Sequence, residues 1–84
     1  MCGIAGVITR QKQHSSYLAA HYAYLMMYAE QHRGQESAGI TTDCRGELLT
    51  YKGEGLATHV FDEKRLRKLK GELAIGHVRY GTTG

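Results

Sequence analysis

The second residue of the chain is a cysteine, a residue type that can act as a nucleophile once it becomes the N-terminus. Initiator methionine is commonly removed when the next residue is small, which would leave a free α-amino group and a thiol on Cys2. The pKa of an α-amino group lies near neutrality and below that of a thiol. A fraction of the amine is therefore unprotonated at neutral pH and can accept the thiol proton, so that one residue carries both nucleophile and base. The simpler interpretation is an incidental cysteine.

Two arginines stand beside glycines in segments that could bind a carboxylate. Arg33 precedes Gly34 within residues 31–40 (QHRGQESAGI), and Arg79 lies within residues 76–84 (GHVRYGTTG). The planar guanidinium can hold a carboxylate through two parallel hydrogen bonds, to which threonine hydroxyls and loop amides can add further bonds. The simpler interpretations are a solvated arginine at a helix end for Arg33 and a surface arginine on an edge strand for Arg79.

Taken together, these three segments resemble the class II glutamine amidotransferases, whose nucleophile is an N-terminal cysteine. Residues 2–4 (CGI), 33–34 (RG) and 77–80 (HVRY) fill the slots of the family pattern in order. The amino-acid sequences of the second and third segments are similar to those of the amidophosphoribosyltransferases, whereas the sugar-phosphate aminotransferases tend to carry YRGYDSAG and HTRW. The resemblance covers nearly the whole chain, and residues 10–24 are its least informative part.

The resemblance implies a glutamine amide hydrolysis in which Cys2 is the catalytic residue. Its thiolate would add to the side-chain carbonyl of glutamine, ammonia would leave, and water would hydrolyse the glutamyl thioester. In the family, the ammonia then passes to a second domain, where it displaces pyrophosphate from phosphoribosyl pyrophosphate with Mg²⁺. The product is phosphoribosylamine, and this reaction is the first step of purine biosynthesis.

The same resemblance implies which residues bind glutamine. Arg79 would hold the α-carboxylate of glutamine, while Tyr80 and Thr82 would shape the loop that closes over it. Arg33 and Gly34 would line the nucleophile's side of the pocket. No metal site and no cofactor are expected within this segment.

Residues 1–84 are predicted to be the N-terminal part of a glutaminase domain. The family's oxyanion hole uses an Asn-Gly pair, and this chain contains no Asn. That pair, the Asp for the glutamine amino group, the phosphoribosyltransferase domain and the iron–sulfur cluster of some members are expected in a longer chain, which we expect to form a homo-oligomer. The 84 residues alone are expected to be inactive. The alternatives are another class II amidotransferase, such as glucosamine-6-phosphate synthase, and a non-catalytic truncated product or small basic binding module.

Length, charge and cysteine content narrow the class of protein. A chain of 84 residues forms one domain or less, and a net charge of +3 is too small to indicate a nucleic acid partner. Residues 1–8 have no positively charged start and their apolar run breaks at Thr9, so we expect no signal peptide. No apolar stretch approaches the ~20 residues of a membrane span, and we expect a cytoplasmic protein with no membrane contact. Cys2 and Cys44 have neither zinc nor redox spacing, and the five histidines are scattered.

The pattern of apolar residues, glycines and capping residues predicts an α+β fold. The expected elements are a strand over 3–9, a helix over 16–32, a hairpin over 38–42 and 47–52, a short helix over 63–69, a strand over 73–78 and a loop over 79–84. The family resemblance further implies part of a four-layer αββα sandwich of the N-terminal-nucleophile hydrolase type. Because the sequence stops in a Gly/Thr loop straight after a strand, we expect it to be truncated.

The long helix has a start signal and an apolar face. Ser15 or Ser16 can cap its first turn by accepting a backbone hydrogen bond. One helical face is expected to carry the apolar side chains Leu18, Tyr22, Leu25, Met26 and Ala29.

Local signals also mark the shorter elements. Residues 43–46 (DCRG) supply a turn for the hairpin, and residues 53–55 (GEG) are expected to break its second strand. Asp62 can cap the short helix, with Leu66 and Leu69 directed inward. The basic run over 64–70 (KRLRKLK) is then the solvated face of that helix, and the alternative is a nucleic-acid-binding patch.

Overall fold

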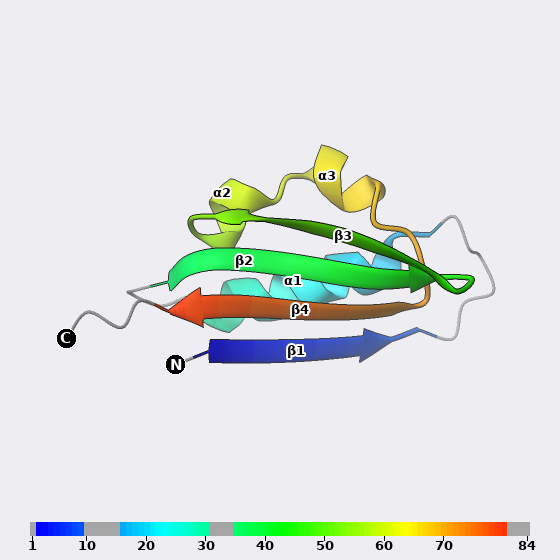
Figure 1. Ribbon diagram of the computed structural model, residues 1–84, viewed down its shortest axis with the longest axis horizontal. Helices are drawn as coiled ribbons and strands as arrows, with labels where there is room; N and C mark the ends of the chain where they lie inside the picture. Colours follow the sequence, from blue (N-terminus) through cyan, green and yellow to red (C-terminus); the bar gives the residue numbers. More distant parts are fainter. Residues whose placement is uncertain (1, 10–15, 31–34, 81–84) are drawn as a thin grey trace.

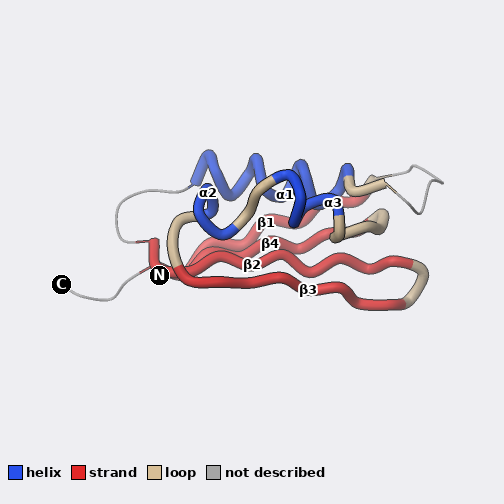
Figure 2. Tube along the Cα trace, turned by 90° about the horizontal axis from the view of Figure 1, so that it is seen from above, coloured by secondary structure: helices blue, strands red, loops and turns tan. Residues whose placement is uncertain are grey.

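The computed structural model describes residues 2–9, 16–30 and 35–80. Its elements are β1 (Cys2–Ile8), α1 (Leu18–Glu30), β2 (Gln35–Cys44), β3 (Glu47–Glu54), α2 (Ala57–Val60), α3 (Glu63–Arg67) and β4 (Leu73–Tyr80). The four strands form one sheet in the order β1-β4-β2-β3, and every neighbouring pair is antiparallel (Figure 1). All three helices lie on the same side of this sheet (Figure 2). The predicted α+β class is confirmed.

The hairpin between β2 and β3 is built around the predicted turn. Arg45 and Gly46 both have positive φ, 56° and 89°, which is the backbone of a two-residue turn that matches the twist of the flanking strands. The backbone N–H of Gly46 donates to Oδ1 of Asp43 over 2.8 Å. Both strands are longer than the predicted 38–42 and 47–52 because the pairing continues for several residues beyond the apolar core of each strand.

The prediction that residues 53–55 break β3 was wrong for the first two residues. β3 continues through Glu54, and the chain bends at Gly55, where φ is 115°. Gly53 remains in the strand and admits α2, since a Cβ at this position would lie 3.3 Å from Cγ1 of Val60. The glycine therefore serves close packing of a helix on the strand. The short helix α2 itself was not predicted.

Helix α1 begins at Leu18, two residues after the predicted start, and has one of the two predicted caps. Oγ of Ser16 accepts from the backbone N–H of Leu18 over 3.1 Å, which identifies Ser16 as the cap, whereas Ser15 lies outside the described residues. Four of the five residues of the predicted apolar face, Tyr22, Leu25, Met26 and Ala29, do line one groove, but this face does not meet the core of the sheet. Tyr22, Leu25 and Met26 are 48%, 44% and 43% exposed. The fully or almost fully buried side chains of the helix are Ala19, Ala20, Ala23 and Met27.

The physical reason is the short distance between α1 and the sheet. A Cβ at Gly76 of β4 would lie 2.7 Å from Sδ of Met27 and 3.6 Å from Cβ of Ala23. Helix alanines and a strand glycine therefore allow close contact, and the larger side chains of α1 turn outward. The groove between the outer side of α1 and β1 is lined by Gly6, Val7, Ile8, Tyr22, Leu25, Met26 and Ala29.

Residues 56–70 close the core beside α1. Oδ1 of Asp62 accepts from the backbone N–H of Arg65 over 2.8 Å, and Leu66 and Leu69 are 5% and 3% exposed, so the predicted cap and inward face are confirmed. The helix ends at Arg67, two residues before the predicted end. The ring of Phe61 packs edge-on against Tyr51 of β3 with centroids 5.6 Å apart.

None of the described helices is long and apolar enough to cross a membrane.

Gly71 connects this segment to β4 in a conformation that requires glycine. Its φ is 136°, and a Cβ there would overlap the carbonyl group of Asp43. We therefore expect Gly71→Ala to lower the free energy of unfolding by about 1–3 kcal/mol, as measured by urea denaturation. Gly6→Ala is the matched control, because no atom lies within 4 Å of a Cβ at that position, and its effect should stay below about 0.5 kcal/mol. Equal effects of the two changes would contradict the steric explanation.

Thr42 on β2 carries a hydroxyl that the core does not satisfy. The residue is fully buried, and its Oγ1 has no hydrogen-bond partner among the described residues. Because Val has the same shape and no polar group to desolvate, Thr42→Val should raise the free energy of unfolding by about 1 kcal/mol in urea denaturation. Thr41→Val should give no such gain, since Oγ1 of Thr41 shares a 2.9 Å hydrogen bond with Thr50. A destabilised Thr42→Val variant would show that the buried hydroxyl is bonded after all.

Candidate functional site at the end of the sheet

The strand register aligns four residues from distant parts of the sequence across one end of the sheet. Cys2 of β1 pairs with Arg79 of β4, Arg79 pairs with Ser37 of β2, and Ser37 pairs with Glu54 of β3. We call these four residues the terminal row. Directly opposite Cα atoms in antiparallel strands lie about 4.5–5.5 Å apart. Two residues of the predicted site, Cys2 and Arg79, are therefore direct neighbours in the sheet.

An open pocket borders the terminal row on the side of β2 and β3. It has a volume of about 490 Å³ and is lined by Glu36, Ser37, Glu54, Gly55 and Arg79. The side chain of Arg79 is exposed. The ion pair found among the described residues joins Arg67 and Glu63 and does not involve Arg79. Its guanidinium can therefore bind an anion that enters the pocket, such as a carboxylate.

A β-bulge shapes this pocket. Gln35 pairs with Tyr80 and Ser37 with Arg79, so that Glu36 is an extra residue in β2. The backbone N–H of Gly55 donates to the carbonyl oxygen of Glu36 over 2.6 Å, which ties the bulge to the bend after β3. Bulges interrupt regular pairing and redirect side chains, and they are common beside functional sites.

Strand β4 extends further than the predicted 73–78 and contains Arg79 and Tyr80, which we had assigned to the following loop. Side chains alternate between the two faces of a strand. Val78 is 1% exposed in the helix-covered core and Tyr80 is half-buried against the same core. Arg79, which lies between them, is exposed on the opposite, open face. Arg79 and Tyr80 therefore leave the sheet on different faces.

The structure gives less information about the other predicted site residues. Arg33, Gly34 and Thr82 lie outside the described residues. Cys2 is placed by its backbone pairing with Arg79. Among the pocket residues, Glu36, Ser37, Glu54 and Gly55 were not identified from the sequence, because only the pairing of β2 with both β3 and β4 brings them to Arg79.

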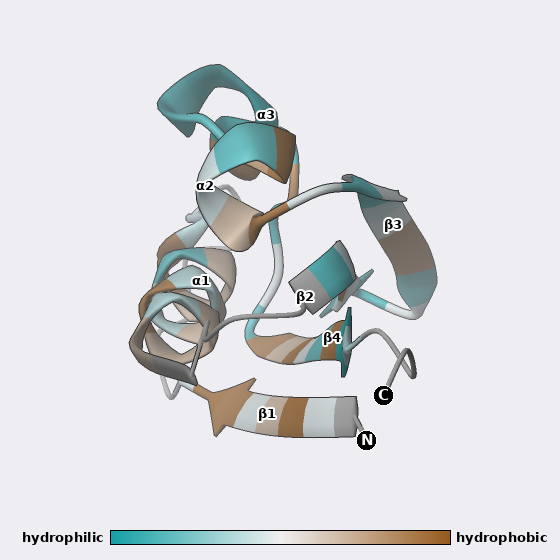
Figure 3. Cartoon of the chain, turned by 90° about the vertical axis from the view of Figure 1, so that its left-hand side faces the viewer, coloured by the Kyte–Doolittle hydropathy of each residue, from teal (hydrophilic) through white to brown (hydrophobic). Residues whose placement is uncertain are grey.

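The open face of the sheet changes from polar to apolar with distance from the terminal row. The second row contains Ile4, His77, Gly39 and Lys52, the third contains Gly6, Ile75, Thr41 and Thr50, and the fourth contains Ile8, Leu73, Asp43 and Leu48. In the fourth row, Ile8 and Leu48 are 75% and 69% exposed. Figure 3 shows this face on the side of the sheet away from the three helices. The polar end of the face coincides with the pocket at Arg79.

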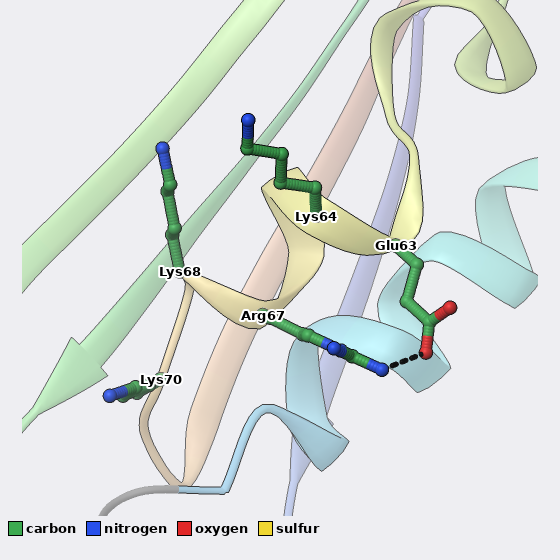
Figure 4. A pocket seen from close by; sticks show the side chains of 5 residues that line it. All are labelled: Glu63, Lys64, Arg67, Lys68 and Lys70. Carbon is green, nitrogen blue, oxygen red and sulfur yellow. Dashed lines mark hydrogen bonds and ion pairs between the residues drawn. The ribbon is translucent and has the colours of Figure 1, made fainter.

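Helix α3 lies away from the end of the sheet at which β1 begins and β4 ends (Figure 1). A second pocket, of about 650 Å³, lies beside this helix. It is lined by Glu63, Lys64, Arg67, Lys68 and Lys70 (Figure 4). Arg67 turns toward Glu63 and forms a 2.7 Å ion pair, while Lys70 extends on the other side. Hydrogen bonds, first to Tyr17 and then to Glu63, raise the pKa of the Arg67 guanidinium above its ordinary value.

This second pocket has the features of a solvated helix face. Leu66 and Leu69 point into the core, and the charged side chains on the other side of the helix are exposed. No group of three or more His, Cys, Asp or Glu side chains is suited to hold a metal ion within the part of the chain that the structure describes. The terminal row and its pocket are therefore the better candidate for chemistry.

Comparisons with known proteins show which proteins the chain resembles. No protein-family model matches the chain. The chain is 48% identical over 83 residues to the amidophosphoribosyltransferase of Methanothermobacter thermautotrophicus, covering 99% of this chain and 17% of that protein. It is 45% identical over 83 residues to the enzyme of the same name from Mycobacterium leprae, covering 99% of this chain and 14% of that protein.

Two solved structures share the fold. A glutamine phosphoribosylpyrophosphate amidotransferase from B. subtilis, solved with ADP and GMP, superposes with a TM-score of 0.70 at 41% identity, over 98% of this chain and 16% of that one. An allosteric regulatory enzyme of purine biosynthesis superposes with a TM-score of 0.77 at 42% identity, over 92% of this chain and 15% of that one. Over nearly its whole length the chain is homologous to the amidophosphoribosyltransferases, of which it spans about one-sixth.

Proposed function

We propose that this chain provides the nucleophile and the carboxylate clamp of a glutamine amidotransferase that supplies ammonia for phosphoribosylamine synthesis. The observation that carries the proposal is the direct pairing of Cys2 with Arg79 beside an open pocket. The Cα atoms of such a directly opposite pair lie about 4.5–5.5 Å apart, so the two side chains start from neighbouring positions. In this proposal one glutamine contacts both residues, with its carboxylate at Arg79 and its amide at Cys2.

The mechanism follows from the chemistry of an N-terminal cysteine. With Met1 removed, the α-amino group of Cys2 accepts the thiol proton, and the thiolate adds to the amide carbonyl carbon. The C–N bond then breaks, and ammonia leaves with the proton that the amine returns. Water hydrolyses the resulting thioester to glutamate and restores the thiol. Arg79 fixes the distance between the amide and the thiolate by holding the α-carboxylate.

The remaining site residues take supporting roles in this proposal. Arg33 and Gly34 stand just before β2 in the sequence and would line the nucleophile's side of the pocket. Thr82 follows β4 and would add a hydroxyl to the loop that closes over glutamine. Tyr80, which packs against the core, would anchor the start of that loop.

The proposal includes a covering layer over the open face, as in a four-layer αββα sandwich. Apolar side chains in the third and fourth rows, including Ile8, Leu48 and Ile75, are between 47% and 75% exposed. Strand β1 is an edge strand, and an apolar groove runs between it and α1. An exposed apolar face and a strand edge are features that further chain normally covers.

The activity of the whole enzyme is also part of the proposal, because the chain spans 14–17% of its curated relatives. Phosphoribosyl pyrophosphate, Mg²⁺ and any iron–sulfur cluster would belong to the remainder of a longer, cytoplasmic, homo-oligomeric enzyme. The glucosamine-6-phosphate-forming type remains the second candidate. The similarity to amidophosphoribosyltransferases favours the phosphoribosylamine reaction. An activity assay that supplies each acceptor substrate in turn would decide between the two, because only the true acceptor would give product.

The nucleophile can be tested in a chimaera in which residues 1–84 replace the matching segment of the Methanothermobacter thermautotrophicus relative. Cys2→Ser should lower glutamine-dependent phosphoribosylamine formation by about a thousandfold or more, because a serine hydroxyl is not ionised by the neighbouring amine. Synthesis from free ammonia should persist, since the acceptor site lies in another domain. Cys44→Ser, a change in a half-buried residue at the end of β2, should leave both activities unchanged. Equal loss of both activities in Cys2→Ser would refute the assignment.

The clamp can be tested in the same chimaera by Arg79→Lys. Lysine keeps the charge but cannot form two parallel hydrogen bonds to a carboxylate. Charged hydrogen bonds are worth about 1.5–3 kcal/mol, so kcat/KM for glutamine should fall roughly ten- to a hundredfold with ammonia-dependent turnover unchanged. Arg67→Lys on α3 is the matched control and should have no effect, because its ion pair with Glu63 is exposed. Wild-type glutamine kinetics in Arg79→Lys would reassign the clamp to Arg33.

A further inference from the structure

His77 of β4 lies in the second row of the open face, directly opposite Gly39 of β2. A Cβ built on Gly39 would lie 2.6 Å from Nε2 and 2.9 Å from Cε1 of His77, and 3.0 Å from Cβ of Lys52. Gly39 is buried although it lies on the open face. The imidazole of His77 therefore leans from β4 toward β2 and covers the backbone at Gly39. Any larger residue at position 39 would displace the ring.

The seated ring stands next to Arg79. The two residues are two positions apart on β4, so that both side chains leave the same face about 7 Å apart along the strand. His77 is exposed, and its side chain forms no hydrogen bond with a residue that the structure describes. The ring therefore lies on the β2 side of β4, which is also the side of the pocket that Arg79 lines.

On this geometry we propose that His77 is a positioning residue for Arg79. The ring, which lies over Gly39, blocks the guanidinium from folding back over β2 and keeps it in the pocket formed by Glu36, Ser37, Glu54 and Gly55. The proposal rests on the proposed function, because it assigns a second residue to glutamine capture. It predicts that glutamine binding depends on the size and position of the ring and does not depend on its nitrogen atoms.

The kinetic test uses the chimaera described above with His77→Ala, His77→Phe and Gly39→Ala. Without the ring, or with the ring displaced, KM for glutamine should rise about tenfold while kcat stays within about twofold, because an imprecise clamp weakens binding before it affects chemistry. His77→Phe should restore KM close to that of the parent. The double variant Gly39→Ala/His77→Ala should be no worse than either single change, as expected for two residues that act through one contact. Lys52→Ala, which keeps the Cβ beside Gly39, is the control and should match the parent.

The outcomes separate this inference from the proposed function. A parent chimaera without glutamine-dependent activity would count against the proposed function. An active parent with unchanged KM in His77→Ala and Gly39→Ala would overturn the positioning role alone, as would a His77→Phe variant as poor as His77→Ala. If His77→Ala fails to fold, His77→Phe and Gly39→Ala decide the matter, because the first keeps the ring and the second moves it.

A second measurement needs no activity. In nuclear magnetic resonance spectra of the chimaera, the ring of His77 should shift the α-proton signals of Gly39, and His77→Ala should abolish the shift. His77→Phe should preserve a ring-current shift, since a phenyl ring fills the same space. Gly39 signals that do not respond to His77→Ala would show that the ring is not seated on β2, and the inference would fall whatever the enzymatic result.

Discussion

The pairing of β1 with β4 is the constraint on which the rest of the structure depends. It places the second residue of the chain opposite Arg79, and these two residues have no local relation in the sequence. Because successive side chains alternate between faces, a slip of one residue would turn Arg79 into the helix-covered core. A buried guanidinium without a partner would be strongly unfavourable there. The chemistry proposed for this sheet end therefore requires one register.

Small residues on the helix-covered face hold that register. Ala74, Gly76 and Val78 of β4 meet α1, and only a residue without Cβ fits beneath Met27 at position 76. A one-residue shift would bring His77 under the helix in place of glycine, where its ring would collide with Met27. Close packing on the helix-covered face thus fixes the strand register, and this register aligns the polar residues on the open face. The core and the site are two consequences of the same alternation.

Local signals in the sequence predicted what is local in the fold. The Ser16 and Asp62 caps and the turn at residues 43–46 each depend on hydrogen bonds within a few residues, and all are present. The inward face of α1 could not be obtained in this way, because it depends on Gly76, nearly fifty residues away along the chain. Large apolar side chains were expected inside, but the narrow space admits alanine instead.

The same distinction applies to the site. Cys2 and Arg79 were recognisable from their residue types and from the family resemblance, whereas Ser37 and Glu54 carry no local mark of function. They reach Arg79 only because β4 inserts between β1 and β2 and brings the far end of the hairpin with it. The start of β4 at Leu73 was predicted correctly, but its end was not, since Arg79 and Tyr80 extend the strand by pairing with β2 rather than by their own propensity.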